Sequence, residues 1–534
     1  GPSLVAAPWS EALGVAASAL SAAPADRIAV LGGARMTNES QYAWAKLAKG
    51  VLGTDHVDAQ LGDGLPAEVV LGLPRATIDR ACTPGGTIVL LGPDPKEELG
   101  ALYLRLRHAV VHDGATLIEL TPRRTGLSAH AAHSLRVTPG DAAGVVAAMF
   151  GSGSPAGVAG IPVDQLAAAG ATLAAAVAEG SPVTVLLGRP SLAESAGPVV
   201  DGALALHDHL PTATFLSLLR RGNVHGAMDM GLAPGLLPGR ASLADAGRVA
   251  DVWPTVPAAP GHDALGILTA AAAGEIDVLV LLGADLLADV PDRQLAEQAL
   301  AGARTVVAVD LFGTDTVARA DVVLPAVAST ELDGTFTNLE GRVSVVARKV
   351  TSPGTSRPDW AIAVELAERL GADLGFMSVD DVLAELAVVS PLHADLTPET
   401  LAGATREGIL IEGSLEVARP APTSVPGRDG YGLRLVVDRC MYDAGVLVAH
   451  SASLAGLAPG TRAGVEPTDL ARHGIDEGEV VDLISARGTI QVVVAADAGV
   501  ARGTVHLRAN QPDLAVNALI DASAPVTEVR VGRR

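Results

Sequence analysis

The 534-residue chain is too long for a single hydrophobic core, and its length alone predicts about three to four domains. Its composition, 49% hydrophobic and 18% charged, is that of a folded protein, and a net charge of −22 argues against nucleic-acid binding, which needs a basic face. Two isolated cysteines, Cys82 and Cys440, cannot by themselves hold an iron–sulfur cluster or a four-ligand zinc site, so we expect buried free thiols. No apolar run of membrane-spanning length occurs, and no membrane insertion is expected.

The first region alternates strands and helices. An amphipathic helix near the N-terminus (4–23) has no strand before it, which suggests that part of the protein lies upstream of Gly1. A buried strand at 26–33 is followed by a helix over 37–53, and strands at 85–94 and 115–120 flank a helix over 95–114. Buried strands that alternate with helices predict a parallel, doubly wound sheet.

A second region of the same kind begins near 181–190, with strands expected at 276–285, 303–310 and 320–326. It echoes the first: TIVLLGPD and VLVLLGAD place Gly92 and Gly283 at equivalent points, as in a duplicated α/β unit. Ligands of parallel sheets bind at the carboxyl ends of strands, so Gly92, Asp94, Gly283 and Asp285 are candidate cofactor-binding residues. Neither a G-x-G-x-x-G nor a P-loop motif occurs.

The C-terminal third changes character twice. Residues 359–418 are helical in pattern, 417–432 have the Pro, Gly and Ser of a linker, and the remainder alternates strands with glycine turns, which predicts a small β-barrel. The expected fold class is α/β, with two doubly wound parallel-sheet domains and a C-terminal β-barrel. The expected domains are a first α/β domain (1–178), a second α/β domain (179–350), a helical return to the first domain with a linker (351–425), and the barrel (426–534).

Four segments together strongly resemble the molybdopterin oxidoreductase superfamily. They are GARMTNESQYAWAKLAKGVLGTDHVD (33–58), LLGPDPKEELGALYLRLRHAV (90–110), RGNVHGAMDMGLAPGLLPG (221–239) and ADVVLPAVASTELDGTFTNLEGRVS (320–344). The last hundred residues are similar to that superfamily's terminal β-barrel, of the molybdopterin dinucleotide-binding type. Within the superfamily the chain looks most like the G subunit of bacterial NADH–quinone oxidoreductase (respiratory complex I), although formate dehydrogenases carry a similar N-V-x-G-x-x-D-M-G.

The resemblance implies a molybdenum site whose protein ligand should follow the G-T-x-x-V-D segment. Here AQLGDGLP follows Asp58 and contains no Cys, Ser or His; Asp63 is the remaining candidate, against a solvated loop acid. We therefore expect no catalytic residue, no metal ligand and no cofactor in this segment. The resemblance also makes Gly334, Thr335 and Asn338 vestigial cofactor-binding candidates, in a loop that now holds local geometry.

The same resemblance implies a structural scaffold in the peripheral arm of complex I, on the cytoplasmic face of the bacterial plasma membrane. Its expected partners are the other peripheral-arm subunits, including the NADH-binding flavoprotein and the iron–sulfur subunits, and 2Fe–2S and 4Fe–4S clusters are expected in the missing N-terminal region. Two alternatives stay open: an active molybdenum enzyme resembling formate dehydrogenase, and an accessory module that binds a nucleotide without chemistry.

Several histidines and arginines form no motif. The histidines at 56, 108, 112, 130 and 133 are scattered and expected at the surface, and His207 and His209 would point to opposite faces of an extended segment. The arginines at 105, 107, 123 and 124 either bind a phosphate or an anionic partner surface, or pair with neighbouring carboxylates.

Overall fold

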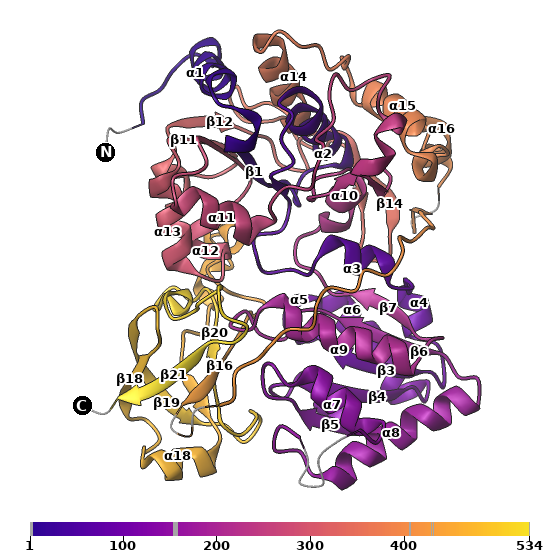
Figure 1. Ribbon diagram of the computed structural model, residues 1–534, viewed down its shortest axis with the longest axis vertical. Coiled ribbons are helices and arrows are strands. Elements are labelled where there is room, and N and C mark those ends of the chain that lie inside the picture. The colour runs from indigo at the N-terminus through magenta and orange to yellow at the C-terminus, as the bar shows by residue number, and fades with distance from the viewer. Residues whose placement is uncertain (1–3, 153–157, 405–406, 429, 431, 533–534) are drawn as a thin grey trace. The chain divides into compact units, whose positions relative to one another are not determined.

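The computed structural model describes residues 4–152, 158–404, 407–428, 430 and 432–532 (Figure 1). The chain divides into two compact units made of interleaved segments. Unit 1 comprises Gly1–Gly62, Arg220–Val290 and Gln294–Leu415. Unit 2 comprises Asp63–Leu219, Pro291–Arg293 and Glu416–Arg534.

Unit 1 is built on a five-stranded parallel sheet. In spatial order its strands are β12 (Val322–Pro325), β11 (Thr305–Asp310), β10 (Val278–Leu282), β1 (Ile28–Gly32) and β2 (Val57–Asp58). The central strands β1 and β10 are apolar and buried along their whole length, because a parallel sheet is covered on both faces and leaves no side for polar residues.

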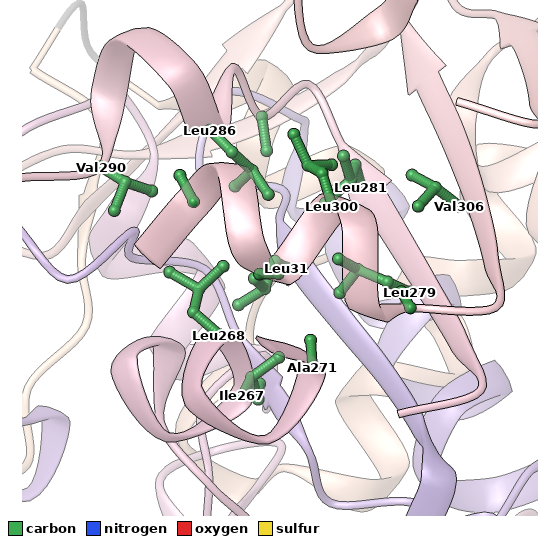
Figure 2. Close-up of a cluster of buried hydrophobic side chains, with 14 of the residues drawn as sticks. Leu31, Ile267, Leu268, Ala271, Leu279, Leu281, Leu286, Val290, Leu300 and Val306 are labelled. Carbon is green, nitrogen blue, oxygen red and sulfur yellow. The ribbon is translucent and has the colours of Figure 1, made fainter. Parts of the chain in front are cut away.

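One face of this sheet packs on the helices α11 (Ala264–Ala272), α12 (Leu286–Asp289) and α13 (Arg293–Gly302). Alternate strand residues point to the same face, so Leu279 and Leu281 of β10 meet Ile267 and Leu268 of α11 in one core, together with Leu31 of β1 (Figure 2). Leucine, valine and alanine fill this core, as a chain with 2% aromatic residues requires.

A second group of helices in unit 1 surrounds α2 (Asn38–Ala45), which continues into a π-helical turn over Lys46–Val51. The helices α14 (Asp359–Arg369) and α15 (Val379–Val389) pack on α2, and α1 (Trp9–Ala22) packs on α14 and β12. Every residue of α2 is buried, including four polar ones, so this helix requires internal hydrogen-bond partners.

Unit 2 contains the second parallel sheet and the barrel. The sheet order is β5 (His133–Arg136), β4 (Thr116–Thr121), β3 (Thr87–Leu91), β6 (Val183–Leu187) and β7 (Thr214–Ser217). The longer helices of this part are α6 (Gly100–His112), α7 (Ala142–Met149), α8 (Val163–Ala178) and α9 (Ala196–His209). The closed barrel runs in the order β16 (Leu433–Asp438), β20 (Thr504–Arg508), β17 (Ala463–Val465), β19 (Thr489–Ala496), β18 (Val480–Ile484) and β21 (Glu528–Gly532).

The expected fold class, two parallel sheets and a C-terminal barrel, is confirmed. The two α/β domains are expected to be contiguous, over 1–178 and 179–350, but each sheet takes strands from both ranges. Strands β1 and β2 pair in one sheet with β10 to β12, whereas β6 and β7 extend the sheet of β3 to β5. The helices of the 351–425 stretch belong to unit 1, and residues 429 and 431 of the expected linker lie outside the described residues. Within the described ranges, no helix has the length and apolarity to cross a membrane.

Asp359, the first residue of α14, is buried, and its carbonyl accepts a hydrogen bond from Trp44 Nε1 (3.0 Å). Burial raises the pKa of Asp359 from 3.8 to about 7, with a further upward contribution from Asp310. Because the folded chain then holds this proton more tightly than the unfolded chain, its contribution to stability is complete below pH 3.8 and is lost as the pH rises through 7.

We predict that Asp359→Asn flattens the pH dependence of stability. Between about pH 5 and about pH 8 the melting temperature of the wild type should fall more steeply than that of the variant. Glu368→Gln, which replaces an exposed carboxyl on the same helix, is the control and should follow the wild type. If the melting temperatures of the wild type and Asp359→Asn changed equally with pH, the raised pKa of Asp359 would be contradicted.

Candidate functional site

Hydrogen bonds within unit 1 hold residues 54–58, which precede the expected position of a metal ligand. Thr54 Oγ1 donates to the carbonyl of Ile28 in β1 (2.7 Å). Asp58, at the end of β2, accepts from the backbone N–H of Gln60 (2.9 Å) and from that of Ala264, the first residue of α11 (2.9 Å). The carboxylate of Asp58 therefore caps and anchors neighbouring backbone.

Asp63 is the one acidic side chain in the loop that follows, and it is buried. Its Oδ2 lies 3.7 Å from Nη2 of Arg439, whose side chain is also buried, and Asp63 is a charge neighbour of Arg189. Residues 59–66 offer no thiolate, hydroxyl or imidazole. Asp63 serves as an arginine counter-ion, so this set of side chains does not fit a molybdenum centre that needs a protein ligand.

Lys49 binds Asp55, which lies just before β2, and the 221–239 segment. Its buried ammonium lies 2.7 Å from Asp55 Oδ1 and donates to the carbonyls of Ala233 and Leu236. Asp55 Oδ2 in turn accepts from the backbone N–H of Gly235 (2.6 Å). Burial lowers the pKa of Lys49, and Asp55 opposes that effect. The pair fixes the RGNVHGAMDMGLAPGLLPG segment to the end of α2.

The glycine turn after β3 in unit 2 packs closely against the turn after β6, which contains Gly188. A Cβ on Gly92 would stand 3.0 Å from the backbone nitrogen of Gly188, and one on Gly188 would stand 2.7 Å from Cδ of Pro93. The two glycines are needed because two chain turns meet there.

Asp94 organises the loop after β4. It caps the short helix α5 (Pro95–Glu98) by accepting from the backbone N–H of Lys96 (3.0 Å), and it also accepts from the N–H of Gly126 (3.0 Å). Burial raises the pKa of Asp94, and these two hydrogen bonds oppose the effect. Both carboxylate oxygens thus have partners in the protein.

Arg123 joins the end of β4 to the barrel within unit 2. Its Nε donates to Asp438 at the end of β16, and His506 Nε2 lies 2.7 Å from the other oxygen of Asp438. Burial alone would raise the pKa of Asp438, but His506 and Arg123 hold it far below its ordinary value. Arg123 therefore pairs with a carboxylate, as does Arg105 with Asp79 (2.5 Å).

In unit 1 the glycine turn after β10 has space around it. Gly283 has a positive φ of 56° and no atom within 4 Å of an added Cβ. Asp285, next in the turn, accepts from Thr316 Oγ1 (2.6 Å), and burial raises its pKa. Three arginines, Arg35, Arg220 and Arg221, lie close to Asp289 at the end of α12. No local sequence pattern predicts this group, because its members come from distant segments.

The segment ELDGTFTNLEGRVS forms a β-hairpin of β13 (Gly334–Thr337) and β14 (Arg342–Val346). Asn338 Oδ1 accepts from the N–H groups of Glu340 (3.0 Å) and Arg342 (2.9 Å), which closes the turn. The prediction that Asn338 holds local geometry agrees with this arrangement.

The backbone N–H groups of the hairpin are bound by the protein. Thr335 N and Oγ1 donate to the two oxygens of Glu39 (2.9 and 2.7 Å), and Thr337 N donates to Asn223 Oδ1 (2.7 Å). Asn223 also donates to Asn38 Oδ1 (3.0 Å) on α2. This network supplies the partners that the buried polar face of α2 requires, and these donors do not form an open cradle.

Among the residues that the structure describes, the histidines and cysteines form no metal site. His108 and His112 lie against each other on the exposed side of α6 with ring centroids 4.9 Å apart, and His56 stacks on His262 at 4.8 Å. Cys82 and Cys440 are free and half-buried, less buried than expected. Across the described residues, no group of three or more His, Cys, Asp and Glu side chains is arranged to hold a metal ion.

Known families and structures match this architecture. The molybdopterin oxidoreductase model matches residues 2–152 and 169–369, and the molydopterin dinucleotide binding domain model matches 444–530. The chain belongs to the molybdopterin oxidoreductase family. Among solved structures, acetylene hydratase from Pelobacter acetylenicus has the same fold, with a TM-score of 0.63 and 14% identity over 99% of this chain and 90% of that one.

Curated relatives carry several roles. The alpha subunit of an NADPH-Fe(3+) oxidoreductase of Geobacter sulfurreducens is 28% identical over 98% of this chain and 66% of its own length. The NADH-quinone oxidoreductase G subunit of Mycobacterium tuberculosis is 30% identical over 91% and 57%. The alpha subunit of F420-dependent formate dehydrogenase 2 of Methanococcus maripaludis is 27% identical over 97% and 86%. The chain thus spans less than two thirds of the first two relatives.

We predict that Gly334 cannot be enlarged. A Cβ there would stand 2.6 Å from Glu39 Oε2 and 2.8 Å from Thr37 Cβ, so Gly334→Val should lower the free energy of unfolding by about 3 kcal/mol or more. Gly313→Ala, at an exposed position with no atom within 4 Å, is the control and should be close to neutral. Urea unfolding measures both, and an unchanged Gly334→Val midpoint would show that the hairpin can move off α2.

Proposed function

We propose that this chain is the molybdopterin-type body of the G subunit of an NADH–quinone oxidoreductase, and that it acts as a scaffold without metal chemistry of its own. The observation that carries the proposal is the loop at 59–66, which contains no thiolate, hydroxyl or imidazole and whose only acid, Asp63, lies against Arg439. Relatives of the G-subunit type that align with 91% of the chain support the assignment.

The internal pairing of buried charges suits a scaffold. Electron transfer along a chain of clusters needs fixed separations, and a body whose buried ions are neutralised by its own residues keeps its shape with no ligand bound. Lys49–Asp55 in unit 1 and Arg123–Asp438 in unit 2 are such pairs. Breaking a buried pair costs about 3–5 kcal/mol, so each resists local opening.

The proposal places the redox centres outside these residues. The 2Fe–2S and 4Fe–4S clusters would belong to an N-terminal region or to neighbouring subunits, since Cys82 and Cys440 lie far apart in sequence. The partners would be the NADH-binding flavoprotein and the iron–sulfur subunits of the peripheral arm. The working location would be the cytoplasmic face of a bacterial plasma membrane.

A molybdenum-dependent oxidoreductase resembling formate dehydrogenase is the second candidate. Formate dehydrogenase relatives, one of them 27% identical over 97% of this chain, favour it. In that case Asp63 would have to leave Arg439 in order to bind the metal.

Elemental analysis of the protein purified with its natural partners separates the two. The scaffold predicts far less than one molybdenum per chain. Asp63→Asn removes the counter-ion of Arg439 and should lower the yield of the complex, but NADH:quinone reduction per assembled complex should stay close to wild type. Stoichiometric molybdenum that is lost in Asp63→Asn would overturn the scaffold proposal. Asp443→Asn, which alters another close carboxylate neighbour of Arg439, is the matched control.

A further inference from the structure

Three arginines and one carboxylate meet at the carboxyl end of the unit 1 sheet. Asp289 Oδ2 lies 3.3 Å from Nη2 of Arg35 and 3.5 Å from Nη2 of Arg221, and Oδ1 lies 3.5 Å from Nη2 of Arg220. Arg35 follows β1, Arg220 and Arg221 precede the helix α10 (Val224–Asp229), and Asp289 closes α12. Both oxygens of one carboxylate therefore face guanidinium groups.

Three guanidinium groups face this one carboxylate. Burial lowers the pKa of Arg35, Asp289 raises it, and Arg221 and Arg220 lower it further. Asp285 and Asp310 lie nearby, and burial raises the pKa of both. Arg221 has a φ of 79°, which is uncommon for a residue other than glycine, and such strain persists only where the surroundings enforce it.

Three glycines of the surrounding loops have no side chain or backbone packed over them. An added Cβ would meet no atom within 4 Å at Gly283, Gly222 or Gly313. Arg220 Nη1 is buried and makes no hydrogen bond with the described part of the chain. A guanidinium fork matches the geometry of a tetrahedral oxyanion, and the carboxyl ends of parallel strands are where anionic ligands bind.

We propose that Asp289 is a built-in counter-ion that occupies a latent oxyanion site formed by Arg35, Arg220 and Arg221. A phosphate group placed there would compete with the carboxylate for the same guanidinium groups, so the native chain does not fit a dinucleotide phosphate at this point. Neutralising Asp289 opens the site to inorganic phosphate. This inference concerns unit 1 alone and does not depend on the scaffold role.

The test is a thermal-shift titration of Asp289→Asn with inorganic phosphate, at constant ionic strength adjusted with chloride. The variant should melt below the wild type without phosphate, since three largely buried cations lose their carboxylate, and should regain stability in a saturable manner. Its apparent affinity for phosphate should exceed that of the wild type at least about tenfold. Asp315→Asn, an exposed acid of the same unit, is the control and should respond as the wild type does.

The double variant Arg220→Gln/Asp289→Asn keeps the inference testable if Asp289→Asn folds poorly. With one cation fewer, it should be more stable than the single variant in chloride and should lose the phosphate response. A wild type that binds phosphate as tightly as Asp289→Asn would overturn the inference, and so would a response that survives the loss of Arg220. Neither result bears on the molybdenum content of the complex, which tests the scaffold separately.

Discussion

Buried charges in both units are the constraint on which the rest of this structure depends. An ion removed from water destabilises the fold by several kcal/mol unless an opposite charge and hydrogen bonds replace the solvent. The chain meets this condition with its own residues: Arg240 binds Asp229 through both oxygens, and Asp438 is held between Arg123 and His506. These ion pairs stabilise both units with residues of the chain itself.

The same constraint explains why the hairpin of β13 and β14 sits on α2. A fully buried helix with Asn38 and Glu39 in its first turn needs donors and acceptors, and the hairpin supplies them through Thr335 and Thr337. Gln41 on the same helix instead donates to the carbonyls of Gly33 and Asn223. The glycine at 334 is then required by a close approach to Glu39, which is a packing requirement of the protein itself. The segment resembles a cofactor-binding loop in sequence, and in this structure it forms a hairpin that hydrogen-bonds to the polar residues of α2.

The sequence predicts the elements well and their assembly poorly. Strands such as 28–32 and 278–282 are recognisable because burial on both faces leaves continuous runs of Val, Leu and Ile. The sequence does not show that these two strands pair with each other across some 250 residues. The two LLG-x-D regions carry the same local pattern, so only long-range contacts decide which sheet a strand joins. The same distinction applies to single residues. The local role of Asn338 can be predicted from its turn, whereas the fold alone brings Arg35, Arg220 and Asp289 together.

On the proposed function, the residue that would anchor a metal is missing from a cofactor-binding fold. When the residue that anchors a metal is missing, the arginines and amides that once balanced a polyanion would be left as buried, unpaired donors, and that state is costly. Several such donors have a carboxylate partner in the chain, namely Arg439 at Asp63, Gly126 at Asp94 and the three arginines at Asp289, although Arg220 Nη1 makes no hydrogen bond with the described residues. At these three places a carboxylate of the chain itself faces the arginine or the amide, which is the arrangement that the proposed scaffold requires.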